Sequence, residues 1–297
     1  MSYRVIKELG RGSMGKVELI EHEVYGKSVL KTNLKKDGHR VAVNEGQALK
    51  YLSETDKCPW NIKVYNYEED PDGSTVRVFM EYFEGIDLTM IRLDFMADGF
   101  DRWMLLVRET VAAVTCLHDM GVAHRDIKLA NIMFDDTNLK LVDFGFACVK
   151  KTFRSLCKIG MMGSPYYLSP ELWLGENTKG TAEARFKQYM ASDVWALAHT
   201  LFRLAYKRNL VGRRKNKADI KKWVTLGTKV PLYFYPNDKE LDRLKITSAQ
   251  SHEINVILKP LFARDTDTRI ANFKALVRSL GIGSRVAVAE APSRGEV

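Results

Sequence analysis

The chain has 297 residues, and its content of 45% hydrophobic, 28% charged and 10% aromatic residues excludes a disordered or fibrous protein. A chain of this length buries about 75% of the surface that it exposes when unfolded, and near this size one core usually divides into two. The formal net charge of +9 is concentrated in Lys207 to Lys222, which holds eight basic residues and one acid. We therefore expect two lobes and an acidic docking partner at that segment, and such a local cluster argues against nucleic acid as a partner.

No apolar stretch approaches the roughly 20 residues that a membrane-spanning helix needs. Residues 1–7 offer neither an apolar signal core nor a glycine at position 2 for a lipid anchor. We therefore expect an intracellular protein, cytoplasmic or nuclear, without a membrane partner. The cysteines form no C-x-x-C arrangement, which argues against a zinc site or a disulfide framework. Four free, buried or half-buried thiols are expected, at Cys58, Cys116, Cys148 and Cys157.

Alternating apolar and polar residues at 3–9 and 16–22, followed by a third short run at 27–33, predict three antiparallel strands. Helical spacing of apolar residues then predicts a helix at 44–53, and a compact apolar run predicts another strand at 77–82. The first part of the chain is therefore expected to be mainly antiparallel sheet with one main helix.

After Gly85 the pattern changes to long helical segments, which predict a larger, mostly helical second part. Its helices are expected at 101–120, 192–206, 217–226 and 253–262. The last residues, 283–297, have no periodicity and are expected to form a flexible tail. The sequence thus predicts an α+β chain that divides into 1–82, 83–282 and this tail.

A glycine-rich run, Gly10-Arg11-Gly12-Ser13-Met14-Gly15-Lys16-Val17, separates the first two predicted strands. A plain hairpin turn is the bland alternative, but a strand follows the run where a dinucleotide-binding unit would begin a helix. Glycines in a strand–loop–strand turn let backbone N–H groups approach phosphate oxygens without an intervening side chain. We therefore expect Gly10, Gly12 and Gly15 to bind a triphosphate and Val17 to cover an adenine.

Lys31 follows the apolar pair Val29-Leu30 on the third predicted strand, and Glu45 lies on the helix that follows. A lysine in this setting is usually a solvated edge residue. A carboxylate on the helix could instead hold the ammonium group against phosphates and preserve its charge.

Two acidic motifs follow in the second part, His124-Arg125-Asp126-Ile127-Lys128-Leu129-Ala130-Asn131 and Asp143-Phe144-Gly145. In this order and spacing they resemble the H-R-D-x-x-x-x-N catalytic loop and the D-F-G motif of the eukaryotic-type protein kinase family. The segment Gly163 to Glu171, the helix that begins at Ser192-Asp193 and the later Asp267-Thr268-Arg269 are similar to further motifs of that family. A chance occurrence of the whole ordered set is negligible.

The resemblance covers about Tyr3 to Leu280 and implies a bilobal fold, an N-terminal antiparallel sheet lobe with one main helix and a larger, mostly helical C-terminal lobe. It also implies ATP and Mg²⁺ as cofactors, with Mn²⁺ as a substitute. Asn131 and Asp143 would bind the metal, because magnesium prefers oxygen ligands. The residues implied to act on the phosphoryl group are Asp126 as catalytic base, Lys128, Lys31 and Glu45.

An adenine pocket between the lobes is implied by the same resemblance. The backbone at Glu81 and Phe83 would hydrogen-bond the base. The side chains implied to enclose the nucleotide are Val17, Val29, Met80, Asp87 and Met133. Without the surrounding motifs, the apolar members of this set would be read as ordinary core.

Lys128 together with Ser164, which would bridge Asp126 and Lys128, is typical of the serine/threonine branch of the family. We therefore expect transfer of the γ-phosphoryl group of ATP to serine or threonine hydroxyls of proteins. Structural roles are implied for Phe144, Gly145, Glu171, Asp193 and Arg269. Thr152 and Ser155 are candidate phosphorylation sites.

Relatives that prefer basic substrates carry acids where this chain has Ala130, Tyr166 and Arg203, which predicts an acidic or non-basic substrate. A scaffold of the same fold without activity is one alternative, but Lys31 and the acidic motifs are intact. A small-molecule kinase is another, but such enzymes generally lack the Ser169-Pro170-Glu171 element.

Overall fold

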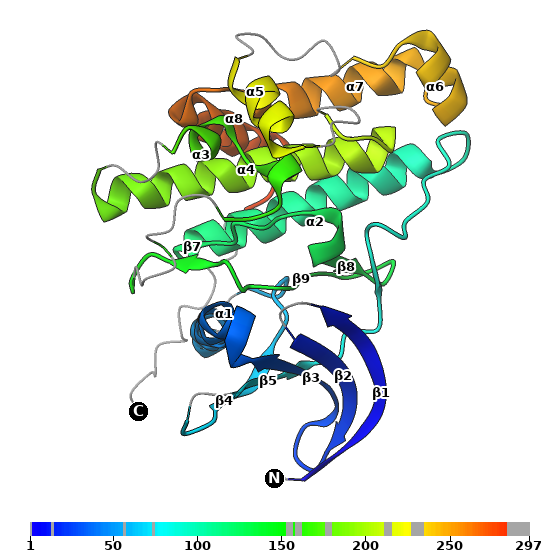
Figure 1. Cartoon of the computed structure of the whole chain (residues 1–297). Coiled ribbons are helices and arrows are strands. Elements are labelled where there is room, and N and C mark those ends of the chain that lie inside the picture. Colours follow the sequence, from blue (N-terminus) through cyan, green and yellow to red (C-terminus); the bar gives the residue numbers. More distant parts are fainter. Residues whose placement is uncertain are drawn as a thin grey trace, which may run out of the picture.

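The computed structural model describes residues 2–12, 15–55, 58–72, 75–152, 157, 162–175, 180–210, 216–226 and 235–283. The N-terminal part consists mainly of a curved sheet and the C-terminal part mainly of helices, and short strands lie between the two (Figure 1). None of the helices in the described ranges is long and apolar enough to span a membrane. The bilobal α+β fold expected from the sequence is confirmed, while the tail beyond Gly283 lies outside the described residues.

Five antiparallel strands form the N-terminal sheet in the order β1-β2-β3-β5-β4. They are β1 (Tyr3–Gly12), β2 (Gly15–His22), β3 (Gly26–Leu34), β4 (Val64–Glu69) and β5 (Thr75–Glu81). The helix α1 (Lys35–Thr55) covers one face of the sheet through apolar residues that include Ala48, Leu49 and Leu52. It begins well before the predicted 44–53, and β4 was not predicted, because most of the strand is only half-buried and lacks a clear alternation.

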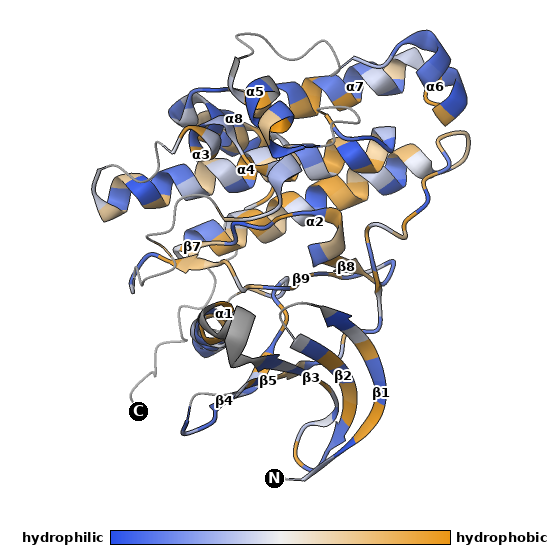
Figure 2. Cartoon of the chain, viewed as in Figure 1, coloured by the Kyte–Doolittle hydropathy of each residue, from blue (hydrophilic) through white to orange (hydrophobic). Residues whose placement is uncertain are grey.

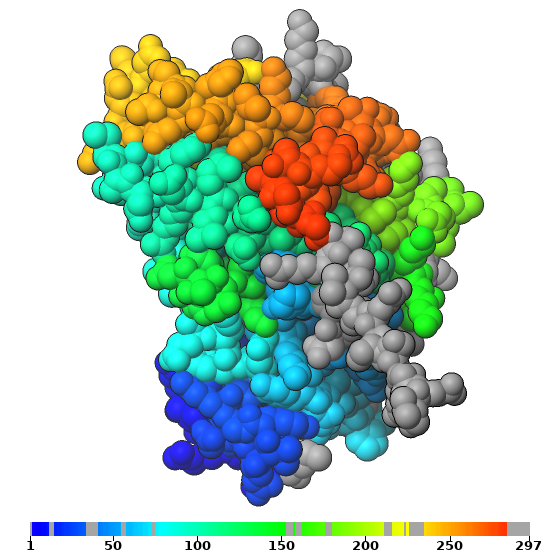
Figure 3. Space-filling view, turned by 180° about the vertical axis from the view of Figure 1, so that it is seen from behind, coloured from blue at the N-terminus to red at the C-terminus, as the bar shows by residue number. Residues whose placement is uncertain are grey.

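The helical part is built around α2 (Gly99–Asp119) and α4 (Ala182–Tyr206). The other helices are α3 (Pro170–Leu174), α5 (Lys217–Leu226), α6 (Asp238–Leu244), α7 (Ser248–Leu258) and α8 (Thr266–Ser279). A 3₁₀ turn, Lys259–Phe262, follows α7, because Pro260 cannot continue the helix. Seen from behind, α8 lies across the helical part (Figure 3) and it packs against α4.

Short strands between the two parts frame the acidic motifs. β6 (Ile86–Asp87), β8 (Ile132–Phe134) and β9 (Leu139–Leu141) form a small sheet, and β7 (Val122–Ala123) pairs with β10 (Cys148–Val149). The loop that contains His124 to Asn131 therefore connects β7 to β8, and the motif Asp143-Phe144-Gly145 lies between β9 and β10. Two separate sequence motifs are thus brought to the same edge of the helical part.

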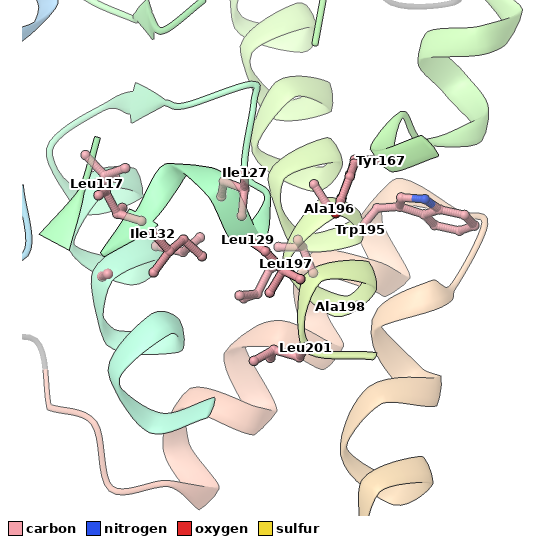
Figure 4. Close-up of a cluster of buried hydrophobic side chains, with 14 of the residues drawn as sticks. Leu117, Ile127, Leu129, Ile132, Tyr167, Trp195, Ala196, Leu197, Ala198 and Leu201 are labelled. Atoms are coloured by element: carbon pink, nitrogen blue, oxygen red, sulfur yellow. The ribbon is translucent and has the colours of Figure 1, made fainter. Parts of the chain in front are cut away.

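A continuous hydrophobic core supports that edge. Leu117 from α2, Ile127 and Leu129 from the loop, and Leu197 and Leu201 from α4 are all buried and face one another (Figure 4). The helices carry hydrophilic residues on their other sides, as amphipathic helices do (Figure 2). Burial of Ile127 and Leu129 fixes Lys128 between them and Asp126 beside them.

The expectation of four free thiols is wrong. The structure pairs Cys58 with Cys116 and Cys148 with Cys157, with Cα–Cα distances of 5.8 and 5.1 Å. Such distances lie in the range of disulfide bonds. The partners were not predictable from spacing, because each pair is brought together by tertiary packing rather than by a local motif.

Candidate active site

Lys31 is the centre of a charged cluster between the sheet and the helical part. Its Nζ lies 2.7 Å from Glu45 Oε2 on α1 and 3.1 Å from Asp143 Oδ1 after β9. Burial opposes the charged form, but the two carboxylates raise the pKa of Lys31 above its usual value. Desolvation likewise opposes ionisation of Asp143, and Lys31 outweighs it and lowers the pKa of that carboxyl. The lysine therefore stays charged between the two carboxylates.

Asp126 accepts hydrogen bonds from three neighbours. Lys128 Nζ donates to its Oδ2 at 2.6 Å, and the backbone N–H and Oγ of Ser164 each donate to its Oδ1 at 3.0 Å. Asn131 Nδ2 donates to the Asp126 carbonyl and carboxylate at 2.9 and 3.0 Å. Lys128, Asn131 and Ser164 thus surround the carboxylate of Asp126.

The loop backbone is held from below by Asp193 on α4. The buried Asp193 carboxylate accepts hydrogen bonds from the backbone N–H groups of His124 at 2.8 Å and Arg125 at 2.7 Å. Arg125 and Asp143 both have left-handed backbone conformations, with φ of 67° and 63°. Strained backbone of this kind persists where surrounding contacts enforce it and is concentrated at functional sites.

Phe144 and Gly145 connect the second motif to α1. The Phe144 ring is fully buried and lies 4.7 Å from the His124 ring. Gly145 approaches α1 so closely that a Cβ there would collide with the Val41 side chain. Close packing at this point keeps Glu45 and Asp143 within reach of the same lysine.

Asn44 is a site residue that sequence reasoning missed. Its Nδ2 donates to the carbonyls of Gly145 at 3.1 Å and Ala147 at 2.8 Å, so it ties α1 to the backbone that follows Asp143. No motif marks it, because any polar residue beside Glu45 looks like a solvated helix position. Only its distance from Gly145 in space reveals the contact.

Replacing Asn44 with leucine should lower kcat/KM by roughly 10-fold, since two hydrogen bonds that align Glu45 with Asp143 are lost. Steady-state kinetics at several ATP concentrations would measure the change. The matched control is Asn272→Leu, which removes a similar amide-to-carbonyl bond, to Pro260 on the far side of the helical part. Equal kinetics in the two variants would contradict the assignment.

The glycine-rich run connects the antiparallel strands β1 and β2, so it lies in a strand–loop–strand turn. Gly10 pairs with Val17 and Gly12 with Gly15 across β1 and β2. A Cβ on Gly15 would collide with the backbone of Thr32, so only glycine allows this approach. Ser13 and Met14 lie outside the described residues.

Four of the predicted adenine pocket residues lie in two pairs of neighbouring strands, one pair in each of two sheets. Val29 on β3 pairs with Met80 on β5, and both are buried, while Met133 on β8 pairs with Asp87 on β6. Asp87 Oδ1 accepts a hydrogen bond from Thr89 N at 2.8 Å. The half-buried Val17 packs against the same core.

The remaining predicted residues lie in separate segments of the chain. Glu81 and Phe83 lie at and just after the end of β5, and both are half-buried. Thr152 is exposed, and Ser155 lies outside the described residues. In the segment 207–222, Arg208 pairs with Glu240 at 2.5 Å, while the described lysines of α5 are exposed.

A buried ion pair lies under the site. Arg269 on α8 contacts Glu171 on α3 at 2.7 Å, and both side chains are almost completely buried. Asp265 begins α8 by accepting a hydrogen bond from Thr268 N at 2.7 Å, which places Arg269 on the inner face of the first turn.

His199 is a buried histidine that lies on α4 next to Tyr167. The Leu210 N–H donates to its Nε2 at 3.0 Å, and burial lowers its pKa to about 3. The unfolded chain binds a proton at this residue below about pH 6.5, whereas the native protein does not. As the pH is lowered from about 6.5 to about 3, this residue should therefore decrease the free energy of unfolding by about 1.4 kcal/mol for each pH unit.

Denaturant titrations of the wild type and His199→Leu at several pH values would test this expectation. The variant loses the bond to Leu210 at every pH, but its stability should depend less on pH in that window. Parallel pH profiles for the two proteins would contradict it.

Oxygen donors suited to a magnesium ion and a triphosphate lie at this site. The Asp143 carboxylate is 41% exposed, and the amide oxygen of Asn131 stays available because its Nδ2 is the group bound to Asp126. Hard oxygen ligands of this kind fit Mg²⁺, and Lys31 supplies a positive charge for phosphate oxygens.

A family model of the protein kinase domain matches residues 3–279. The chain belongs to the protein kinase family. Mouse (Mus musculus) serine/threonine-protein kinase Nek9 is 32% identical over 212 residues, which cover 69% of this kinase chain and 20% of that protein. Zebrafish (Danio rerio) maternal embryonic leucine zipper kinase is 32% identical over 212 residues, covering 68% and 28%. Human (Homo sapiens) Rho-associated protein kinase 1 is 29% identical over 188 residues, covering 60% and 13%.

The kinase chain therefore spans less than a third of the length of these relatives. Their names identify them as kinases, and that of Nek9 specifies serine and threonine. The resemblance found in the sequence is confirmed by the family match, and the family generally uses ATP and Mg²⁺.

Proposed function

We propose that this chain is an active serine/threonine protein kinase that transfers the γ-phosphoryl group of ATP to protein hydroxyls. The observation that carries the proposal is the arrangement of Lys31, Asp126 and Asp143 in one charged cluster. Lys31 contacts Asp143 directly, and the charge of Lys128, which holds Asp126, also lowers the pKa of Asp143. Residues far apart in the sequence thus act on one another electrostatically.

Each of these side chains has a defined part in the proposal. Lys31, held by Glu45, would bind phosphate oxygens, and Asn131 and Asp143 would hold Mg²⁺, which when bound neutralises charge on the phosphates. Asp126 would accept or orient the proton of the acceptor hydroxyl. Lys128 would contact the transferred group, and Ser164 would hold Asp126 and Lys128 together. Positioning and charge neutralisation suffice for phosphoryl transfer.

The nucleotide and its surroundings are part of the same proposal. The predicted pocket from Val17 to Met133 would hold the adenine, with backbone contacts at Glu81 and Phe83. Substrates with acidic or non-basic residues near the hydroxyl suit a cleft that lacks acids at Ala130, Tyr166 and Arg203. An acidic partner at Lys207 to Lys222, a regulatory phosphate on Thr152 or Ser155, and an intracellular location stay predictions.

Labelled ATP, Mg²⁺ and two generic acceptors, an acidic casein and a basic histone, would test the proposal. The wild type should label serine and threonine, as read by phosphoamino acid analysis. Lys31→Met should lose most of the transfer, and the matched control Lys239→Met, on the exposed face of α6, should keep it.

A wild type that binds ATP but transfers no label would contradict the proposal and favour a scaffold without activity. Transfer to a small molecule in place of either protein would favour the third alternative. In each case ATP binding, followed by calorimetry, separates a failed reaction from a failed preparation.

A further inference from the structure

The disulfide bond between Cys148 and Cys157 adjoins the loop that contains Asp126. Cys148 belongs to β10, where it pairs with Ala123 of β7, the residue directly before that loop. Cys148 and Cys157 are 0% and 2% exposed, so the bond is buried. It therefore ties Cys157 covalently to a strand that leads into the loop.

The backbone of Cys157 makes a second contact, with Tyr189 on α4. The Tyr189 hydroxyl donates to the Cys157 carbonyl, and the tyrosine side chain is completely buried. A buried hydroxyl that loses its acceptor is destabilised, because water cannot replace the lost partner. The position of the Tyr189 side chain therefore depends on where Cys157 lies.

The ring of the same tyrosine covers Arg125, which directly precedes Asp126. The guanidinium carbon of Arg125 lies 4.2 Å from the centroid of the Tyr189 ring, and Arg125 is almost completely buried. A cation is attracted to an aromatic face, most strongly where water is excluded. The left-handed backbone of Arg125 needs enforcing contacts of this kind. Tyr189 thus joins the disulfide to the backbone beside Asp126.

We propose that Cys148 and Cys157 form a reversible redox site and that formation of their disulfide bond raises the rate of phosphoryl transfer. The inference rests on the proposed kinase function and adds a means of regulating the same site. In the intracellular location predicted from the sequence, disulfide bonds are usually transient and redox-sensing.

The direction of the effect follows from the arrangement that contains the bond. In that arrangement Glu45 holds Lys31 at 2.7 Å and Ser164 holds Asp126 at 3.0 Å, so the site is assembled. Without the bond, only noncovalent contacts hold Cys157 in place. When it leaves, the buried tyrosine hydroxyl loses its acceptor and its ring no longer fixes the neighbouring arginine. The reduced protein should therefore be the less active form.

A small-molecule disulfide such as oxidised glutathione would form the bond by thiol–disulfide exchange. One cysteine thiolate attacks the glutathione disulfide, which gives a mixed disulfide and releases one glutathione thiolate. The other cysteine thiolate attacks the mixed disulfide, forms the Cys148–Cys157 bond and releases the second. The two protein thiols are oxidised, the glutathione disulfide is reduced to two thiols, and these take up the two protons. Reduced glutathione reverses both steps.

The wild type, equilibrated in glutathione buffers from fully reduced to fully oxidised, tests the proposal. Alkylation and peptide mass spectrometry would show which cysteines are paired, and transfer to casein or histone would give the rate. When the Cys148–Cys157 bond forms, kcat should rise roughly 10-fold. The affinity for ATP, measured by calorimetry, should stay close to its reduced value, because the contacts lead to Asp126 and not to Lys31.

Cysteine variants assign the response to one of the two bonds. Cys157→Ser should show the reduced wild-type activity in every buffer. The matched control removes the other bond, between Cys58 and Cys116 on α2, and this double serine variant should keep the wild-type response. Thermal unfolding checks the fold of each variant, and the series on the wild type needs no variant at all.

Tyr189→Phe tests the connection from the bond to the loop. Its disulfide should still form, but the oxidised and reduced proteins should have nearly equal kcat, because the hydroxyl that contacts Cys157 is gone. The matched control is Tyr206→Phe, since Tyr206 is also buried on α4 and hydrogen-bonds Ser251 at 3.2 Å. This control should keep the wild-type response.

Equal transfer by the wild type with the bond formed and broken would overturn this inference and leave the proposed function intact. Faster transfer by the reduced protein, a response that persists in Cys157→Ser, or a bond that forms in none of the buffers would also overturn it. No transfer by the wild type in any buffer would overturn the proposed function, and the inference with it.

Discussion

Replacing Asp126 with asparagine should lower kcat by about 10²–10⁴-fold and leave the affinity for ATP close to that of the wild type. An amide cannot take up the proton that Asp126 would accept from the substrate hydroxyl. Lys31 and Asp143, which are proposed to bind phosphates and metal, contact each other. Asn131, the other proposed metal ligand, also donates to the Asp126 backbone carbonyl, which the substitution leaves in place. The substitution therefore removes the base and leaves the nucleotide contacts in place.

Single-turnover kinetics and calorimetry with ATP would separate these two effects. The matched control is Asp242→Asn, because Asp242 is exposed on α6, and this variant should behave like the wild type. Wild-type turnover in Asp126→Asn would refute the assignment of the base. A large loss of ATP affinity would instead place Asp126 among the nucleotide-binding groups.

Replacing Arg269 with methionine should lower the free energy of unfolding by about 3–5 kcal/mol, because it leaves the Glu171 carboxylate buried without its partner. Arg269 and Glu171 are 0% and 3% exposed, so water cannot solvate the remaining charge. Arg269 Nη1 also donates to the Ala191 carbonyl at 3.0 Å and Nε to the Ala263 carbonyl at 2.8 Å. The loss therefore loosens α3 and α8 from α4 together.

Chemical denaturation followed by tryptophan fluorescence would measure this loss. The control Arg278→Met, exposed on the same helix, should change stability by no more than about 0.5 kcal/mol. The double variant Arg269→Met with Glu171→Leu should recover part of the loss, because no buried charge remains. A single variant as stable as the control would show that the pair contributes little.

Much of the fold follows from patterns that the sequence displays openly. The strands predicted at 16–22 and 27–33 lie within β2 and β3, and the helix at 217–226 has the predicted bounds. Elements without a strong apolar period were missed. In α8, for example, only Arg269 and Phe273 are buried, so its periodicity is weak.

The start of α4 was placed ten residues too late for a related reason. Its first turns bury Phe186 and Tyr189 among polar and charged residues, and the helix begins where the Thr181 side chain accepts a hydrogen bond from Ala184 N. Two buried aromatic residues in a largely polar stretch give too weak an apolar period to be recognised.

The site residues divide in the same way. Motif residues such as Asp126 and Asp143 can be recognised in the sequence because their order and spacing match those of the family's motifs. Asn44 and the partners of the four cysteines are visible only in space, because their contacts join segments with no sequence relation. Arg203 could be aligned from the sequence, but its hydrogen bond to the Tyr167 phenol could not be predicted from it.

The bond between Cys148 and Cys157 closes a ring that contains Thr152, with a sequence separation of 9. A closed ring of this size has far fewer arrangements than the same segment with free ends. A phosphate group attached to Thr152 would therefore have less conformational entropy to remove from this segment while the bond is formed.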